Sequence, residues 1–311
     1  MKKAIFIVGP TAVGKTDLAF KISKLLPSIL ISADSVQVYR GANIISGKDK
    51  TFPTQLLDIV DPTGQFSVRN FVQLVRPIVK KAHSEQKIPI IVGGTGFYVD
   101  ALFGKIDTIS IPPSKDLREK LEKLNVHMLQ EKLKKLSPER FYRMNNSDVN
   151  NKRRLIRAIE VARSTLRSGS GQAGSGQAGS NLPETKAVFI PQEVLMIGLK
   201  TSTENLRKRI IARAEERIKM GALDEAKNLF ENYEQLSSQL RKASGYKELF
   251  DYLKGKLMYD VAKQEWINSE VKTAKNQMTW FKKNKNIVWF DVGQPGFEER
   301  ILMLIRHEFS S

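Results

Sequence analysis

Residues 9–16 read GPTAVGKT and stand between a short apolar run, residues 4–8, and an amphipathic run, residues 17–26. This order predicts a buried strand, a glycine-rich turn and a helix, and the spacing matches G-x-x-x-x-G-K-[ST]. In such a loop, backbone N–H groups close around phosphate oxygens at the positive end of a helix. An ordinary glycine-rich turn is the alternative interpretation. We predict a phosphate-binding loop whose contacts are Gly9, Thr11, Ala12, Gly14, Lys15 and Thr16. Lys15 supplies a positive charge to the outer phosphates, and the Thr16 hydroxyl ligates Mg²⁺.

The charge of the chain indicates a polyanionic partner. The 311 residues carry a net charge of +18 and contain no cysteine. Lysine and arginine side chains that neutralise phosphates release counterions, which makes nucleic acid the commonest such partner, although a merely basic enzyme is the alternative. The absence of cysteine excludes disulfides and thiolate metal sites. The apolar run at residues 4–8 is too short for a signal peptide. We therefore expect a cytoplasmic protein that has no membrane partner.

Polar residues follow two further apolar runs that are predicted to be buried strands. Asp34 follows the run at residues 28–32, and a second glycine turn containing Thr95 follows the run at residues 88–92. In an open parallel sheet, residues just past the carboxyl ends of the strands line the ligand crevice. We expect Asp34 and the Thr95 hydroxyl beside the phosphate loop. The alternatives are that Asp34 only caps a turn and that the second glycine turn is a simple connector.

The rest of the chain predicts an α/β fold, a P-loop NTPase-like parallel sheet flanked by helices, with an all-helical insertion domain. Further strands are expected at residues 194–199 and 287–291. Long helical patterns cover residues 67–84, 116–166, 203–231, 259–283 and 296–309. The predicted organisation is a first part of the core at 1–112, the insertion at 113–190, and core completion with basic C-terminal helices at 191–311. Within the insertion, residues 168–180 repeat SGQAG and predict a flexible tract.

One helical stretch of the insertion concentrates arginine side chains. Arg153 and Arg157 are four residues apart, and Arg154 and Arg157 are three apart, so all three can share a helix face. Such a face suits contacts with nucleic-acid phosphates, and a solvated charged face is the alternative.

Several stretches together resemble the tRNA dimethylallyltransferase (tRNA isopentenyltransferase) family. The matching pieces appear in the family's order: GPTAVGKT at Gly9, SADSVQVYRG at Ser32, LLDIVDP at Leu56, FSV at Phe66, VGGTGFY at Val92, NNKRRLIRAIEV at Asn150, the segment 213–225, SGYKEL at Ser244 and AKNQMTWFKK at Ala274. The family usually has Arg at Val36, a His pair at Thr54 and Gln55, Thr-Ala-Lys at residues 46–48, and Arg at Asn276. These departures bear on the details of tRNA contact.

The resemblance implies transfer of the dimethylallyl group from dimethylallyl diphosphate to N6 of the adenine 3′ to the anticodon, in tRNAs reading codons that begin with U. The phosphate loop, Mg²⁺ on Thr16 and Arg213 then hold the departing diphosphate. Asp34 takes a proton from the adenine amine or orients it, and Thr95 helps fix the diphosphate. We expect a monomer that grips the tRNA anticodon stem-loop. The expected tRNA contacts are Ser35, Gln37, Tyr39, Arg153, Arg154, Arg157, Lys247, Lys275 and Gln277.

Three other functions fit part of the sequence. A P-loop small-molecule kinase explains the loop but leaves the basic helices without a role. An adenylate isopentenyltransferase acting on free AMP does not need an extended basic surface. A nucleotide-switched RNA-binding module makes poor use of Asp34 and Thr95.

Overall fold

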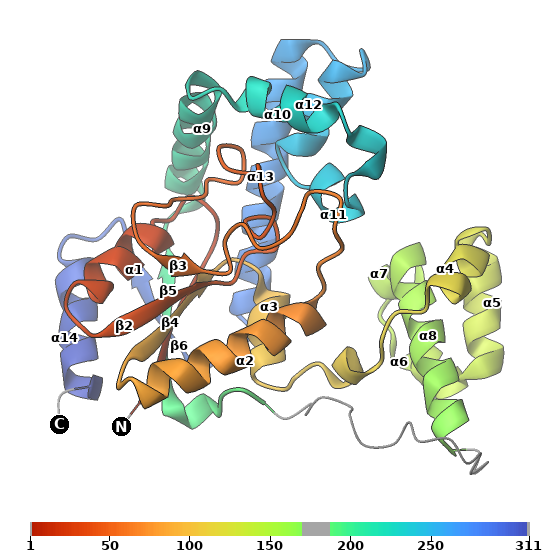
Figure 1. The fold of residues 1–311 in the computed structure, drawn as a ribbon, viewed down its shortest axis with the longest axis horizontal. Coiled ribbons are helices and arrows are strands. Elements are labelled where there is room, and N and C mark those ends of the chain that lie inside the picture. The colour runs from red at the N-terminus through yellow and green to blue at the C-terminus, as the bar shows by residue number, and fades with distance from the viewer. Residues whose placement is uncertain (1, 170–186, 310–311) are drawn as a thin grey trace. The chain divides into compact units, whose positions relative to one another are not determined.

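The computed structural model describes residues 2–169 and 187–309, which belong to two compact units (Figure 1). The first unit comprises Met1–Lys105 and Ala187–Ser311, and the second comprises Ile106–Lys186. The contact pattern therefore divides the chain at slightly different positions from the expected 112/113 and 190/191. Most of the SGQAG tract lies outside the described residues, and the preceding helix extends to Gly169. Among the described helices, none is both long and apolar enough to cross a bilayer.

The first unit is built on a six-stranded parallel sheet in the order β3-β2-β4-β1-β5-β6. The strands are β1 (Ala4–Val8), β2 (Ser28–Ser32), β3 (Thr54–Gln55), β4 (Ile88–Gly93), β5 (Val194–Lys200) and β6 (Ile287–Asp291). The predicted parallel α/β fold is confirmed. The central strands are fully apolar because helices cover both faces of the sheet.

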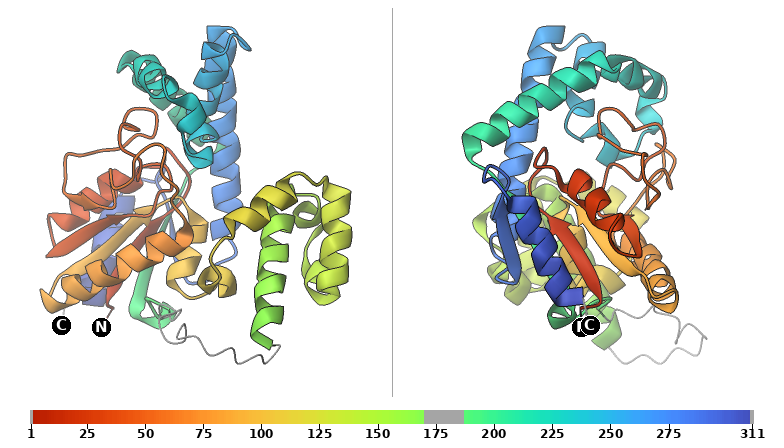
Figure 2. Two further views of the ribbon diagram at one scale, coloured as in Figure 1. Left: turned by 45° about the vertical axis from the view of Figure 1, so that its right-hand side comes forward. Right: turned by 90° about the vertical axis from the view of Figure 1, so that its left-hand side faces the viewer.

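Alternate residues of β1 point into two separate cores, one on each face of the sheet. Ile5 and Ile7 pack with α1 (Lys15–Ser23) and α14 (Phe297–Phe309). The opposite face carries α2 (Val68–Ser84) and α3 (Gly96–Leu102), as the two views of Figure 2 show. Because all strands are parallel, their carboxyl ends meet at one edge of the sheet.

The remaining helices of this unit lie beyond that carboxyl edge (Figure 1). They are α9 (Thr203–Lys219), α10 (Ala222–Phe230), α11 (Ser238–Arg241), α12 (Tyr246–Leu253) and α13 (Tyr259–Phe281), with a short 3₁₀ turn at Tyr233–Gln235. A second 3₁₀ turn, Pro191–Glu193, directly precedes β5 at the opposite edge of the sheet. The prediction of one continuous helix over residues 203–231 is wrong. Gly221 has a φ of 98° and separates α9 from α10, because this left-handed conformation ends the helical path.

The second unit is helical, as the sequence predicts. It contains a 3₁₀ turn at Asp107–Ser110 and the helices α4 (Lys115–Glu122), α5 (Val126–Leu136), α6 (Pro138–Arg143), α7 (Asn146–Val149) and α8 (Lys152–Gly169). Its small core includes Leu129, Leu133, Leu155 and Ile159, which recur at helical spacing on α5 and α8. This unit therefore has an apolar core of its own.

Candidate active site at the carboxyl edge of the sheet

The phosphate loop connects β1 to α1 at the carboxyl edge of the sheet. Gly9 has a φ of 141°, and a Cβ at this position would collide with the carbonyl oxygen of Leu199 on the neighbouring strand. Ala12 also has a positive φ, 61°, and Gly14 is the N-cap of α1. This backbone path places successive N–H groups at a helix N-terminus, which is the arrangement that binds phosphate.

Lys15 begins α1, and its ammonium group folds back on the loop to donate to the Pro10 carbonyl oxygen. Burial, followed by the neighbouring Arg213 guanidinium, lowers the pKa of Lys15 to about 7, and the Asp34 carboxylate acts in the opposite direction. An anion that entered the loop would offset both causes. The amine is therefore set to gain a full positive charge when phosphate binds.

Two side chains from the C-terminal helices reach the phosphate loop. Arg213 on α9 donates from Nη1 to Thr11 Oγ1 at 2.8 Å. Gln277 on α13 accepts from the Thr11 backbone N–H at 2.8 Å. The structure thus brings Arg213 to the loop, and it places Gln277, which was expected among the tRNA contacts, against the loop as well.

Asp34 lies just past the carboxyl end of β2. Its Oδ1 accepts hydrogen bonds from the backbone N–H groups of Val36, at 2.8 Å, and Gln37, at 3.2 Å. The carboxylate therefore caps a turn, which was the alternative interpretation of Asp34 from the sequence. It also lies close enough to Lys15 to raise the pKa of the Lys15 amine. Both turn bonds use Oδ1, so Oδ2 is the oxygen that can act on a substrate.

Thr95 lies past the carboxyl end of β4, which is the strand between β1 and β2 in the sheet. It is the N-cap residue of α3 and is partly buried. The preceding residue, Gly94, packs so closely on the Gln277 amide that a Cβ would collide with it. Thr95 consequently adjoins the side chain that also holds Thr11, which brings the second glycine turn to the phosphate loop.

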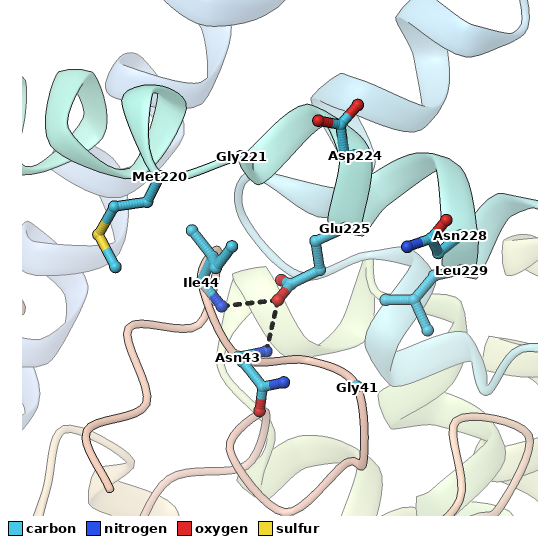
Figure 3. Close-up of a pocket in the computed structure, with 9 residues that line it drawn as sticks. All are labelled: Gly41, Asn43, Ile44, Met220, Gly221, Asp224, Glu225, Asn228 and Leu229. Carbon is cyan, nitrogen blue, oxygen red and sulfur yellow. Dashed lines mark hydrogen bonds between the residues drawn. The ribbon is translucent and has the colours of Figure 1, made fainter. Parts of the chain in front are cut away.

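A partly buried carboxylate that the sequence did not reveal holds the loop after Asp34. Glu225 accepts from the backbone N–H groups of Asn43, at 2.8 Å, Ile44, at 2.7 Å, and Ile45, at 3.0 Å, and from the Tyr246 hydroxyl at 2.7 Å. Figure 3 shows Glu225 pointing from α10 to this loop, at the edge of a cavity of about 480 Å³. Burial and the Glu225 carboxylate raise the pKa of Tyr246, so its hydroxyl remains a donor.

The structure places the expected tRNA contacts of the first unit in three different settings. Lys247 and Lys275 are exposed. Ser35 and Gln37 bond within the site loops, through the Ser35 carbonyl to Gln239 and through the Gln37 amide to the Gly47 carbonyl at 3.2 Å. Tyr39 does not fit the expected role, because its side chain is fully buried in the core and has no surface to offer an RNA.

The three arginines of α8 also differ in their surroundings. Arg153 is exposed, and Arg154 is exposed and paired with Asp148. Arg157 instead donates to Glu160 Oε2 at 3.1 Å and to the carbonyl oxygens of Thr108 and Ile111, both at 2.7 Å. Its guanidinium holds the second unit together, whereas Arg153 and Arg154 present their charges to solvent.

Comparisons with known proteins agree with this site. The sequence model of the IPP transferase family matches residues 37–284. A tRNA dimethylallyltransferase of Halalkalibacterium halodurans is 35% identical over 99% of this chain and 96% of that protein. One of Ligilactobacillus salivarius is 36% identical over 98% of both chains.

Solved structures show the same fold. A full-length tRNA isopentenylpyrophosphate transferase of Bacillus halodurans is similar with a TM-score of 0.70 and 32% identity, covering 99% of this chain and 97% of that one. A eukaryotic dimethylallyltransferase acting on tRNA reaches a TM-score of 0.78 at 24% identity, covering 99% of this chain and 79% of that one. The second likeness concerns the fold alone.

Proposed function

Because the chain belongs to the IPP transferase family, we propose that it transfers the dimethylallyl group of dimethylallyl diphosphate to N6 of the adenine 3′ to the anticodon, in tRNAs reading codons that begin with U. The observation that carries this proposal is the convergence of Lys15, Arg213 and Asp34 on one phosphate loop. Cations beside a loop of backbone donors suit a diphosphate, and a carboxylate across from them suits an attacking amine.

The loop holds the diphosphate end of the donor and stabilises it as it leaves. When the bond between the allylic carbon and the bridging oxygen breaks, its electron pair passes to the diphosphate. In the proposed complex, Lys15, Arg213 and the loop N–H groups bind the oxygens on which this negative charge grows, and Thr95 helps to fix the diphosphate. The preorganised donors are the main source of the rate acceleration, since they need no rearrangement during the reaction.

Asp34 acts on the other reactant. The adenine N6 amine forms the new bond to the allylic carbon as the diphosphate departs, and the nitrogen must lose one proton. The two turn bonds fix Asp34 Oδ1, which leaves Oδ2 to accept that proton. The products are N6-dimethylallyladenine in tRNA and diphosphate, so atoms and charges balance without an oxidant or a nucleoside triphosphate.

We also propose that Mg²⁺ accompanies the diphosphate. Among the described residues, no cluster of three or more acidic or histidine side chains could hold a metal ion by itself. The Thr16 hydroxyl on α1 fits an ion that takes most of its other ligands from phosphate oxygens and water, as Mg²⁺ does. When bound, such an ion neutralises charge on the leaving group.

A labelling assay separates this proposal from its rivals. Incubated with labelled dimethylallyl diphosphate and unmodified tRNA, the protein should place the label on tRNA. Label on AMP but not on tRNA would indicate an adenylate isopentenyltransferase, and phosphate transfer from ATP would indicate a kinase. Membership of the IPP transferase family disfavours the kinase.

Donor binding should take up a proton above pH 7. The pKa of Lys15 is about 7 in the open loop, and bound diphosphate raises it toward its usual value. Above pH 7 the bound state therefore holds more protons than the free state, and affinity falls as pH rises, by up to about tenfold per pH unit. Calorimetry with the donor alone, at pH 8 in two buffers of different ionisation enthalpy, measures this uptake. Lys15→Met should abolish it, and equal uptake in the variant would assign the proton to another group.

Two arginines of α8 should respond differently to replacement by alanine. Arg153→Ala removes an exposed cation, so tRNA binding should weaken. The slope of the logarithm of the binding constant against the logarithm of the salt concentration should become shallower by about one. The melting temperature should not change. Arg157→Ala removes bonds to Glu160 and to two carbonyl groups, so the free energy of unfolding should fall by about 1–3 kcal/mol. Filter binding over a salt series, together with thermal unfolding, checks both. An unchanged slope for Arg153→Ala would remove this residue from the RNA contact surface.

A further inference from the structure

Arg217 is a buried cation close to the phosphate loop, and no role in the proposed reaction has been given to it. It lies on α9 one helical turn after Arg213, and its side chain is 6% exposed. Nη1 donates to Glu270 Oε1 at 2.9 Å, and the same oxygen accepts from Trp266 Nε1 at 2.9 Å. The pair connects α9 to α13.

The ion pair leaves donor capacity on Arg217 unused. Among the described residues, the buried Nη2 of Arg217 has no hydrogen-bond partner, and neither has Glu270 Oε2. Buried guanidinium nitrogens are normally bonded, so an orphaned one needs an explanation. An anionic ligand that arrives with the substrate is one such explanation.

The orphaned nitrogen lies where Arg213 also points. A Cβ on Gly47 would collide with Nη2 of Arg217 and with Nη2 of Arg213, so both guanidinium tips occupy the space beside this glycine. Gly47 has a φ of 64°, and a methyl group added here would have to displace these two side-chain tips. Arg213 in turn contacts Thr11 of the phosphate loop.

Two guanidinium groups at one point repel each other unless an anion joins them. Burial first and Arg213 second lower the pKa of Arg217 to about 10, and Glu270 and Asp34 oppose this. Arg217 nevertheless remains charged at neutral pH. Glu270 compensates it from one side, whereas the side facing Arg213 has an excess of positive charge.

We propose that Arg217 is a second anion-binding arginine of the phosphate loop, whose Nη2 joins Arg213 in holding the diphosphate of the prenyl donor. This inference rests on the proposed function for the identity of the ligand. Gly47 keeps the space for both guanidinium tips, and Glu270 with Trp266 positions Arg217 from behind. A planar guanidinium suits this task because it can bond Glu270 and a phosphate oxygen at the same time.

The test compares affinities for inorganic diphosphate, measured by calorimetry, with melting temperatures. Arg217→Met alone would leave Glu270 buried without its partner, so the double variant Arg217→Met/Glu270→Gln is used instead. The glutamine retains an acceptor for Trp266. A second variant, Gly47→Ala, keeps both members of the ion pair but displaces the guanidinium tips. Arg209→Met is the matched control, because it removes an exposed arginine from the same helix.

We expect the double variant to melt near the wild-type temperature and to bind diphosphate about tenfold to a hundredfold more weakly, as for the loss of one charged hydrogen bond. Gly47→Ala should weaken binding in the same direction, and Arg209→Met should not. If the double variant does not fold, Gly47→Ala/Arg213→Met is compared with Arg213→Met, because a further loss of affinity in a protein that already lacks Arg213 is due to displacement of Arg217. No further loss there would overturn the role of Arg217. Wild-type affinity in Gly47→Ala, or in a folded double variant, would overturn the role of Arg217. Failure of the wild-type protein itself to bind diphosphate would instead overturn the proposed function.

Discussion

Asp34→Asn lowers the rate of prenyl transfer about 10²–10⁴-fold while leaving the binding of donor and tRNA nearly unchanged. The amide oxygen can still accept from the Val36 and Gln37 backbone N–H groups, so the turn persists. An amide cannot, however, take the proton that N6 releases. Single-turnover transfer with saturating enzyme, measured together with tRNA binding, separates the chemical step from binding.

Asp17→Asn is the matched control for this prediction. Asp17 is an exposed carboxylate in the first turn of α1. Its replacement by asparagine changes the net charge by the same amount as Asp34→Asn but does not alter the proposed reacting groups. It should leave the rate within a factor of about two. Weakened tRNA binding with unchanged single-turnover chemistry in Asp34→Asn would refute the assignment of Asp34 as the base.

Arg213→Met should produce the second large loss, about 10²–10³-fold in kcat with a higher KM for the donor. Arg213 touches Thr11 of the loop. In the proposed reaction its charge therefore counts most when the leaving group becomes most negative. Loss of its repulsion should also let the pKa of Lys15 rise. Steady-state kinetics over a range of donor concentrations, with the proton-uptake experiment, measures both effects.

Arg209→Met again provides the comparison, since Arg209 lies four residues earlier on α9 and is exposed. It should retain nearly full kcat. A higher KM with an unchanged kcat in Arg213→Met would mean that Arg213 binds the donor equally in the ground state and the transition state, and would contradict its role at the leaving group.

The sequence predicted the sheet and the phosphate loop well because both depend on local patterns. Each of the central strands is an uninterrupted apolar run, and the glycine spacing of residues 9–16 admits few other conformations. Asp34 could be placed at the site by one general rule, that the carboxyl ends of parallel strands meet at one edge.

Contacts between distant segments could not be predicted in this way. Arg217 and Glu270 are 53 residues apart and meet only because α9 packs on α13. Glu225 binds a loop about 180 residues earlier in the chain, and only the three-dimensional path brings its carboxylate there. The spacing of Arg217, four residues after Arg213, was the one local signal that could have drawn attention to it.

The burial of single side chains and the exact ends of helices were also beyond what the sequence pattern could predict. Tyr39 lies in a polar stretch and could equally have been a surface aromatic, but the surrounding loops and helices enclose it. Gly221 ended a helix that the apolar periodicity alone would have continued, since its left-handed φ is a property of the backbone that the pattern does not reveal. Tertiary packing thus decided the burial of Tyr39, and the local backbone conformation of a glycine decided the end of α9.

A crystal structure with an unreactive thio analogue of dimethylallyl diphosphate tests the central claim most directly. The diphosphate should lie within the loop of residues 9–16, bonded by Lys15 and Arg213, with the allylic carbon turned toward Asp34. A diphosphate bound away from Lys15, or a prenyl chain pointing away from Asp34, would contradict the account.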